Sequence, residues 1–337
     1  MKLSVIIISY NEKKYLPTAI DSCLSQNYKD EFEILIGDDG SSDGSIDIIR
    51  DYAIKYPQII RYFIMDRDVS KPVVPSFRVS DIIKRGIEEA KGEYITVLSG
   101  DDYFCSKDKF SLQTGFLDRD KRKKYSASYS GYKHVWDDGS EEKKEFPYLH
   151  DPGKYIFWSS RYAHISCFTF RKEAVEKEQL LNRFCDDTGM LYTLACAGAW
   201  HYDSKIQFAY RQRDKSIMHE ADVLELNILE VMLLQDTMQK GKLPVCCFAK
   251  YAGPLRYVFE NRNGLKLTKY KKYLESSQQY PYDYLNKICI YDNLKLFAKI
   301  KFDLFIFGVR INRFIFDRIM MFYKIYWKIE RTMKKEG

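Results

Sequence analysis

The sequence predicts an α/β fold in which a mostly parallel central sheet is flanked by helices. The first hundred residues alternate between apolar runs of strand length and segments with helical spacing. The apolar runs are continuous instead of alternating, which is typical of parallel strands buried on both faces. Clusters of Asp, Ser and Gly follow three of these runs. In sheets of this type ligands bind beyond the carboxyl ends of the strands, so the clusters indicate where a site should lie.

Four strands and three helices are predicted before residue 100, and they are taken in chain order. The predicted strands are LSVIIIS (3–9), FEILIG (32–37), IIRYFIM (59–65) and EYITVLS (93–99). The predicted helices are YLPTAIDSCLSQ (15–26), SIDIIRDYAIKY (45–56) and RVSDIIKRGIEEAKG (78–92), the last closed by Gly92. Strands that alternate with helices of this length predict right-handed crossovers between parallel neighbours.

The second part of the chain is less regular. Its predicted elements are a half-buried strand at 125–136 followed by a turn at 137–140, a strand and then a helix at 164–175, a helix with an acidic start at 184–198, a strand and polar loop at 204–220, and non-repeating helices from 221. We therefore expect a domain at 1–220, divided into a ligand-binding part (1–104) and a second part (105–220), then a helical extension (221–286) and a basic tail (287–337).

Composition excludes several classes of protein. A hydrophobic content of 45% and a charged content of 30% are globular values. The net charge of +7 lies in residues 287–337, which hold 12 Lys/Arg and 5 Asp/Glu, whereas the other residues carry 42 of each sign. This balance does not favour a nucleic-acid-binding body. The eight Cys form no C-x-x-C pair, which argues against zinc or a disulfide framework and for reduced thiols in the cytosol.

Neither end of the chain predicts a membrane-spanning segment. The N-terminal apolar run is too short for the core of a signal peptide, and it is interpreted as the first strand. No run of about 18 apolar residues, the length that spans a bilayer, occurs in the sequence.

The segments SYNE (9–12) and DDGSSDGS (38–45) follow the first and second predicted strands. Carboxylates at such an edge accept hydrogen bonds from a nucleotide base or ribose, which makes Asp38 and Asp39 candidates for a nucleoside pocket. Residues of SYNE would line the same pocket: Ser9, Tyr10 and Glu12. The alternative is a polar strand-to-helix turn in which Ser42 or Asp43 caps the next helix.

The segment SGDD (99–102) ends the fourth predicted strand. Asp101 and Asp102 suit Mg²⁺ or Mn²⁺, because hard cations prefer oxygen ligands and take one or two carboxylates together with substrate phosphates. An ordinary turn is the alternative, since Gly and Asp are common turn residues.

Taken together, SVIIISYNE, ILIGDDGSSDGS and GEYITVLSGDDYF resemble the N-terminal half of the family 2 inverting glycosyltransferases, which have a GT-A-type nucleotide-diphospho-sugar transferase fold. The resemblance is strong over 1–104 and weaker to about 220. It implies a nucleotide-sugar donor, Mn²⁺ or Mg²⁺, and transfer of the sugar to a hydroxyl in one inverting displacement. It also implies that Asp39 and Glu12 bind the base or ribose and that Asp101 contacts the metal.

The chain departs from the family pattern at two positions. Ser99 stands where the family often has the first Asp of D-x-D-D, which puts a ribose or metal contact there in doubt. Many members also have an ARN segment whose Arg approaches the diphosphate, and the matching stretch here is IIKRG (82–86). The sequence does not decide which basic residue replaces that Arg: Arg78, Lys84 or Arg85.

A catalytic base is expected in the second part of the domain. An inverting displacement needs a carboxylate that takes the proton of the attacking hydroxyl. The family has an acidic pair at the start of a helix, and FCDDTGML (184–191) resembles it, with Asp186 in the place of the Glu and Asp187 in the place of the base. The alternative role for this pair is capping of the helix N-terminus.

The segment YRQRDKSIMHE (210–220) adds basic residues. Arg211 and Arg213 alternate along a strand end, so they share a face and are candidates for binding the diphosphate or an anionic acceptor. His219 is a candidate metal ligand by the same resemblance, with a solvated basic loop as the alternative. Three other histidines are predicted to be structural: His134, His164 and His201.

The tail predicts an interaction with a membrane surface. Apolar residues recur at helical spacing through 294–330, bordered by Lys and Arg and rich in aromatics, as in helices that lie on an anionic leaflet. Packing against the enzyme body or another subunit is the alternative.

The sequence therefore predicts a glycosyltransferase peripherally associated with the cytoplasmic face of the cell membrane. It would move a hexosyl or N-acetylhexosaminyl group from a UDP-sugar to a glycan acceptor, lipid-linked, in O-antigen or capsule synthesis. The alternative is a catalytically impaired sugar-nucleotide-binding or scaffold protein. A dinucleotide-dependent oxidoreductase is not favoured, because no G-x-G-x-x-G follows the first strand. The oligomeric state stays open.

Overall fold

The computed structural model describes residues 1–67, 75–144, 164–177, 187–213 and 252–261, together with positions 223, 224, 227, 228, 231, 307, 314 and 318. Two compact units divide the chain. The first comprises Met1–Ile156 and Arg161–His219, and the second comprises Phe157–Ser160 and Glu220–Gly337. The predicted boundaries at 104 and 286 stay predictions.

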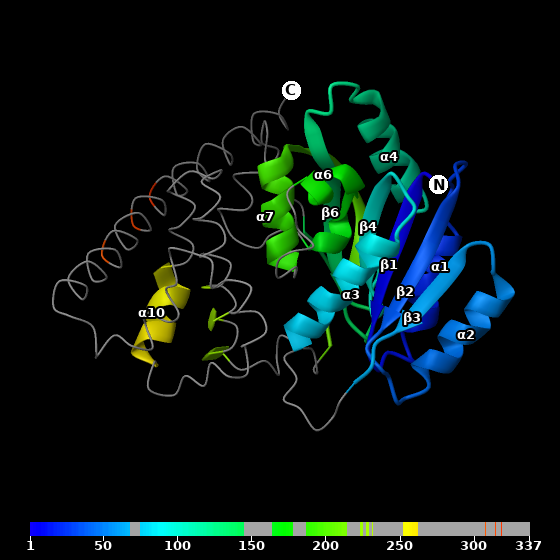
Figure 1. Cartoon of the computed structure of the whole chain (residues 1–337), viewed down its shortest axis with the longest axis horizontal. Coiled ribbons are helices and arrows are strands. Elements are labelled where there is room, and N and C mark those ends of the chain that lie inside the picture. Colours follow the sequence, from blue (N-terminus) through cyan, green and yellow to red (C-terminus); the bar gives the residue numbers. More distant parts are fainter. Residues whose placement is uncertain are drawn as a thin grey trace. The chain divides into compact units, whose positions relative to one another are not determined.

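The described part of the first unit is built on one sheet of nine strands. The strands are β1 (Leu3–Ser9), β2 (Phe32–Asp38), β3 (Ile60–Ile64), β4 (Tyr94–Ser99), β5 (Tyr103–Phe104), β6 (Tyr125–Val135), β7 (Glu141–Lys144), β8 (Phe168–Arg171) and β9 (Ala199–Arg211). Their order is β3-β2-β1-β4-β8-β6-β9-β5, and β7 pairs with β6. Figure 1 shows β3, β2, β1 and β4 side by side, and these four strands are parallel.

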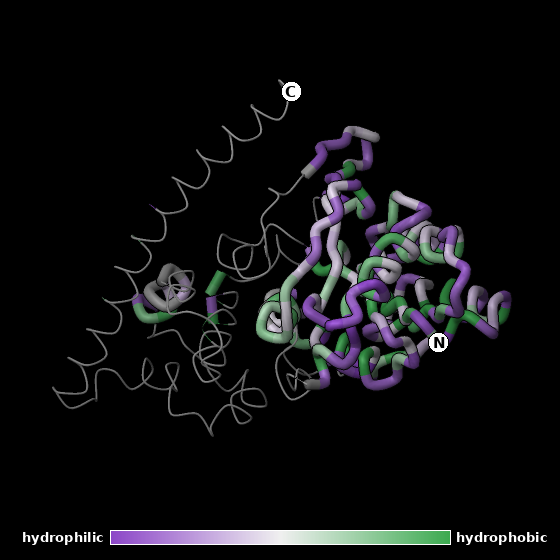
Figure 2. Tube along the Cα trace, turned by 90° about the horizontal axis from the view of Figure 1, so that it is seen from above, coloured by the Kyte–Doolittle hydropathy of each residue, from purple (hydrophilic) through white to green (hydrophobic). Residues whose placement is uncertain are grey.

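Helices connect and cover these strands. They are α1 (Leu16–Leu24), α2 (Ser45–Lys55), α3 (Pro75–Glu89), α4 (Lys109–Arg119), the short 3₁₀ helix η1 (Ile165–Cys167), α6 (Lys172–Lys177) and α7 (Asp187–Ala197). In the second unit the structure describes α10 (Ala252–Glu260). Hydrophobic and hydrophilic stretches alternate along the trace of the first unit, as expected where buried elements are joined by surface turns (Figure 2).

The continuous apolar runs are explained by burial on both faces of the sheet. Ile6 of β1 packs against Gly86 of α3, while Leu35 of β2 clusters with Phe63 and Ile82. Residues that alternate with these point to the opposite face, and they are also fully buried, because α1 packs there against β1. A strand covered on both sides has no solvent face on which polar residues would be favoured.

The predicted strands before residue 100 are confirmed to within a residue or two at each end, but the third helix differs from its prediction. It runs from Pro75 to Glu89 instead of 78–92. Proline is well suited to the first turn of a helix, where its missing N–H has no partner to lose. Gly92 lies beyond the helix end and donates its N–H to Ser4 Oγ at 2.8 Å. A side chain at position 92 would collide with the backbone of Ser4, so Gly92 permits this close approach of the chain to β1.

The second half of the unit contains elements that the patterns did not predict, namely α4, β5, β7 and the first five residues of β9, and η1 lies where the start of a strand was predicted. The strand β8 runs antiparallel to both β4 and β6, so β6 runs in the direction of β4. Because β9 is parallel to β6, its carboxyl end lies at the same edge of the sheet as the ends of β1, β2 and β4. This edge therefore collects residues from both halves of the unit.

None of the helices in the described residues has the length and apolar character needed to cross a bilayer. Most of the predicted tail lies outside the described residues. Within it, Phe307 and Phe314 are 60% and 62% exposed, and the Arg318 guanidinium lies 5.2 Å from the centre of the Phe314 ring.

Candidate active site

The register of the parallel strands aligns three predicted site residues. Ser9 at the end of β1 is paired with Asp38 at the end of β2, and Ile8 is paired with Ser99 at the end of β4. The segments that follow these strands therefore start from one edge of the sheet, as the sequence predicted.

Asp38 shapes the loop after β2. Its two carboxylate oxygens accept hydrogen bonds from the backbone N–H and the hydroxyl of Ser41, both at 2.7 Å, and its side chain is fully buried. The turn between them includes Gly40 with a φ of +73°, a conformation that favours glycine. The side chain of Asp38 thus stabilises the loop. The next residue, Asp39, lies at the carboxyl edge of the sheet.

Asp39 lies between two arginines. Arg67 Nη1 is 2.7 Å from Asp39 Oδ2, and Arg78 Nε donates to Asp39 Oδ1 at 2.5 Å. The Arg67 guanidinium also lies 3.9 Å from the centre of the Tyr10 ring, a cation–π contact. Arg67 was not among the predicted site residues. Its position after the end of β3, which is parallel to β2 and ends at the same edge, would have indicated it.

The structure separates the three basic candidates on α3. Arg78 contacts Asp39, whereas Arg85 pairs with Glu89 at 2.8 Å on its own helix and covers the Phe63 ring. Lys84 is half-buried. Arg78 thus lies at the carboxyl edge of β2 through its bond to Asp39.

Glu12, Asp101 and Asp102 form an acidic cluster with Arg213. The Arg213 guanidinium pairs with Asp101 Oδ2 and lies 3.5 Å from Glu12 Oε1. Asp102 Oδ1 accepts a hydrogen bond from the Arg211 backbone N–H at 2.8 Å. Burial and the neighbouring Asp101 charge raise the pKa of both Glu12 and Asp102 well above the usual range.

Gly100 allows this cluster to form. A side chain at position 100 would collide with Glu12 Oε2, and its backbone N–H donates to Ile8 O at 2.7 Å. The glycine of SGDD is therefore required for close packing of the acidic residues, in addition to its fit to a turn.

The cluster has the chemistry of a divalent cation site. Glu12 Oε2 and Asp102 Oδ2 are buried and make no hydrogen bond within the described part of the chain. Buried carboxylate oxygens without partners are costly, and they are the hard ligands that Mg²⁺ and Mn²⁺ prefer. The described residues contain no group of three His, Cys, Asp or Glu side chains placed to hold a metal ion. Arg213 pairs with Asp101, so a cation bound by this cluster would have to displace its guanidinium. His219, the other predicted ligand, lies outside the described residues.

Arg211 and Arg213 gather around Tyr15 at the start of α1. Their guanidinium carbons lie 4.7 Å and 5.5 Å from the centre of the Tyr15 ring. Asp137, in the turn after β6, accepts hydrogen bonds from Lys14 at 2.9 Å and from Tyr15 at 3.2 Å. The two arginines thus share one face, as their alternation predicted, and border the acidic cluster.

Asp187 is the first residue of α7, and Asp186 lies outside the described residues. Although 44% of the Asp187 side chain is accessible, desolvation by the surrounding protein raises its pKa to about 6. Burial and the charges of Asp102, Asp101 and Asp187 raise the pKa of Tyr210 to about 12, so these three carboxylates lie within electrostatic range of Tyr210.

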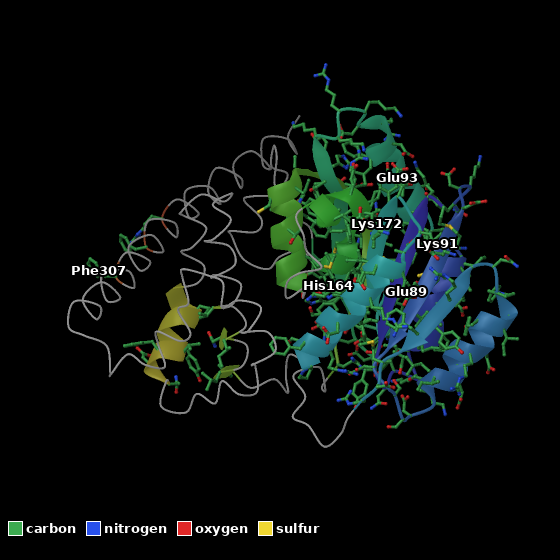
Figure 3. All side chains as sticks on the ribbon, viewed as in Figure 1. Glu89, Lys91, Glu93, His164, Lys172 and Phe307 are labelled. Carbon is green, nitrogen blue, oxygen red and sulfur yellow. The ribbon has the colours of Figure 1, made fainter. Side chains whose placement is uncertain are left out.

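The histidines predicted to be structural differ from one another. His201 stacks on Phe116 with ring centres 3.5 Å apart and bonds Ser128 Oγ at 3.0 Å, which is a packing role. His164, labelled in Figure 3, instead has its Nε2 atom 3.6 Å from Asp187 Oδ2. No sequence pattern predicted this contact, since it depends on the packing of η1 against α7.

Comparison with known proteins places this site in a family. The profile of glycosyl transferase family 2 matches residues 4–178, about half of the chain. An uncharacterized Mycobacterium bovis protein is 31% identical over 147 residues, 44% of this chain and 39% of that protein. A putative teichuronic acid biosynthesis glycosyltransferase of Bacillus subtilis is 29% identical over 150 residues, 44% of this chain and 53% of the relative. The matched segments thus span about half or less of these relatives.

Solved structures share the fold. Staphylococcus aureus TarS 1–349 in complex with UDP has a TM-score of 0.56 at 16% identity, covering 94% of this chain and 92% of the TarS chain. The complex of the same protein with UDP-GlcNAc has a TM-score of 0.53, covering 87% and 92%. The predicted GT-A-type fold is confirmed by this likeness together with the profile match. The chain belongs to glycosyl transferase family 2.

Proposed function

We propose that this glycosyltransferase moves a sugar from a UDP-sugar to a hydroxyl of a glycan acceptor in cell-surface polysaccharide synthesis. The observation that carries the proposal is the acidic cluster of Glu12, Asp101 and Asp102 at the carboxyl edge of the parallel strands, in contact with Arg211 and Arg213. A donor bound at the carboxyl edge of β1, β2 and β4 would have its diphosphate beside this cluster.

The nucleoside would bind over the ends of β1 and β2. Tyr10 is 37% exposed and offers a ring beside Arg67, and the Asp39 carboxylate with its arginines offers both acceptors and donors to the edge of a base. Ser9 and Ser99 would lie beneath the ribose. UDP and UDP-GlcNAc are the ligands of the TarS complexes, and this supports a uridine nucleotide for the present chain.

Glu12, Asp101 and Asp102 would hold Mn²⁺ or Mg²⁺, with His219 as a further predicted ligand. A bound divalent cation offsets the negative charge that develops on a nucleoside diphosphate leaving group. Arg211 and Arg213 would bind the diphosphate, since guanidinium groups match paired oxygen acceptors. Arg213 would exchange its carboxylate partners for the phosphate oxygens when a cation binds.

Asp187 would act as the base of an inverting displacement, with Asp186 beside it. A carboxylate whose pKa is about 6 is mostly ionised near neutral pH, yet it is basic enough to take the proton of an attacking hydroxyl. The acceptor oxygen would form its bond to the anomeric carbon as the bond to the diphosphate breaks, and Asp187 would receive the proton.

The acceptor is proposed to be a lipid-linked glycan at the cytoplasmic face of the membrane. The positive charge of residues 287–337 and the exposed Phe307 and Phe314, seven residues apart on one helical stripe, suit an anionic lipid surface. Relatives named for teichuronic acid and poly(ribitol-phosphate) synthesis support an anionic surface polymer, while O-antigen or capsule was the sequence-based expectation.

A donor panel tests the proposal. Purified protein is incubated with UDP-, GDP- and TDP-sugars with and without Mn²⁺, and release of the nucleoside diphosphate is measured with a lipid-linked glycan acceptor present. Release from a UDP-sugar that requires the acceptor supports transfer. Tight binding of UDP-sugars without release under any condition would instead favour the sugar-nucleotide-binding or scaffold alternative. Removal of 287–337 tests the tail, because partition onto anionic vesicles should be lost.

A further inference from the structure

His164 is held by one backbone hydrogen bond and by two ring contacts. Its Nδ1 atom accepts a hydrogen bond from the Ser166 backbone N–H at 3.2 Å, as the cap of η1. The ring stacks on Phe208 and packs against Tyr210, with ring centres 5.1 Å and 4.9 Å away. With both a hydrogen bond and two ring contacts, the imidazole has one orientation.

The backbone contact fixes the tautomer. Since Nδ1 accepts from an N–H, the ring proton of the neutral imidazole must be on Nε2. Burial lowers the pKa of His164 to about 4, so the ring is neutral near pH 7. His164 therefore presents one N–H donor, and this donor is the atom closest to Asp187.

The Nε2 atom of His164 lies 3.6 Å from Asp187 Oδ2, slightly longer than a hydrogen bond. The ring is fixed, whereas the Asp187 carboxylate is at a helix start and 44% accessible, so the carboxylate is the partner that can move. Contacts between catalytic groups are commonly long without substrate and shorten when it binds.

We propose that His164 is a positioning residue for Asp187. Its Nε2–H donates to Asp187 Oδ2 and leaves Oδ1 directed at the hydroxyl of the acceptor. The inference rests on the proposed function, because it assigns His164 to the base of that reaction. His164 does not relay the proton onward, since its Nδ1 is already used by the Ser166 N–H.

A buried polar network supports the turn that carries His164. The carbonyl of Cys167, the last residue of η1, accepts hydrogen bonds from Lys109 Nζ at 3.1 Å and Gln113 Nε2 at 2.9 Å. Gln113 also donates to Gln207 Oε1 at 2.9 Å. Fully paired buried networks are rigid, so η1 is fixed to α4 and β9.

The groups that face Asp187 determine its titration. The helix α7 packs against η1, β9, β6 and α6, of which η1 contributes His164 and β9 contributes Tyr210. Three charged residues of α6 have other partners, because Lys172 donates to Ala90 O and lies 3.7 Å from Glu176, and Glu173 pairs with Lys123. Burial is the cause of the raised pKa of Asp187 within the described residues. The Nε2–H of His164 is thus placed to donate a hydrogen bond to the Asp187 carboxylate.

The test compares His164→Phe, which keeps a stacking ring but removes the donor, with His164→Gln, which keeps an N–H donor. Donation to a carboxylate stabilises its ionised form, so loss of the donor should raise the pKa of Asp187. His164→Phe is expected to lower kcat about tenfold or more and to move the acid limb of the kcat/KM profile to higher pH. KM for the donor and the affinity for UDP should stay within about twofold. His164→Gln should recover part of kcat and the acid limb.

His201→Phe is the matched control, since it makes the same change at a ring-stacked histidine that has a packing role. Its kcat and the pH dependence of its kcat/KM should equal those of the unchanged protein. If His164→Phe and His164→Gln both keep the original kcat and acid limb, the inference is overturned. If His164→Phe does not fold, His164→Ala, which also removes the donor, takes its place, and an unchanged kcat and acid limb in that variant overturns the inference. An active Asp187→Asn variant would instead remove the proposed function, which separates the two failures.

Discussion

Arg78 Nε donates to Asp39 Oδ1 at 2.5 Å, and this bond joins α3 to the loop after β2. The other Asp39 oxygen is paired with Arg67. Asp39, Arg67 and Arg78 therefore form one group in the proposed nucleoside pocket, with two guanidinium donors and one carboxylate. The affinity for the nucleotide should depend on all three residues.

Replacement of Arg78 should weaken nucleotide binding. In Arg78→Gln the largely buried Asp39 carboxylate loses a charged partner, which costs roughly 1–3 kcal/mol and corresponds to a loss of UDP affinity of about 5- to 150-fold if the pocket must keep Asp39 ordered. Calorimetric titration with UDP measures the change. Arg85→Gln is the control on the same helix, because Arg85 pairs with Glu89. Equal affinities for the two variants would contradict a role for Arg78 in the pocket.

Removal of Arg213 should strengthen cation binding and weaken donor binding. The guanidinium lies against Asp101 and near Glu12, so a cation must displace it. Arg213→Gln removes this competitor, and Mn²⁺ titration without nucleotide should give a dissociation constant lower by about tenfold, from one charge interaction of roughly 1.4 kcal/mol. UDP-sugar affinity should fall at the same time. If Arg213→Gln and Asp102→Asn both bind Mn²⁺ with the affinity of the unchanged protein, this cluster is not the cation site.

Loss of Asp187 should abolish transfer without loss of stability. Its pKa of about 6 lies above the usual range, so the folded protein favours the protonated form, and ionisation reduces stability as pH rises from about 4 to 6. Asp187→Asn removes that cost, so its melting temperature at pH 7.5 should not fall. Transfer should drop by about 100-fold or more, and UDP should still bind. In the unchanged protein, kcat/KM should fall as pH decreases through about 6. An acid limb below pH 5 would contradict the assignment of Asp187 as base.

Lys109 should make stability depend on pH in the alkaline range. Burial lowers its pKa to about 7, whereas the unfolded chain has the ordinary value of 10.5. Between these values the unfolded state binds more protons, so this group makes the protein more stable as pH rises from 7 toward 10.5, by up to about 1.4 kcal/mol per pH unit. Lys109→Met should remove the increase and keep the Gln113 bond to Cys167. Melting temperatures from pH 7 to 10 check this, with the exposed Lys121→Met as control. If melting temperature depends on pH in the same way in the unchanged protein, Lys109→Met and Lys121→Met, the lowered pKa of Lys109 is contradicted.

Local pattern was sufficient for the first half of the sheet because both of its faces are buried. Continuous apolar runs such as that of β1 have few other stable structures, and polar segments after them must lie at the carboxyl edge. The same patterns did not predict α4, and they placed the third helix late, because Gly92 serves a contact with Ser4 that is 88 residues away in sequence.

The sequence by itself determined the fold class, the family and the set of carboxylates and arginines at the strand ends. Only the tertiary structure decided which of them meet. Arg78 and not Arg85 contacts Asp39, because the two residues lie two turns, about 10 Å, apart along α3 and therefore meet different groups. His164 reaches Asp187 because β8 inverts between β4 and β6 and brings η1 against α7. Contacts between segments far apart in the chain depend on the packing of the whole sheet. Hydrophobic periodicity predicts only which residues share a face of one helix or strand.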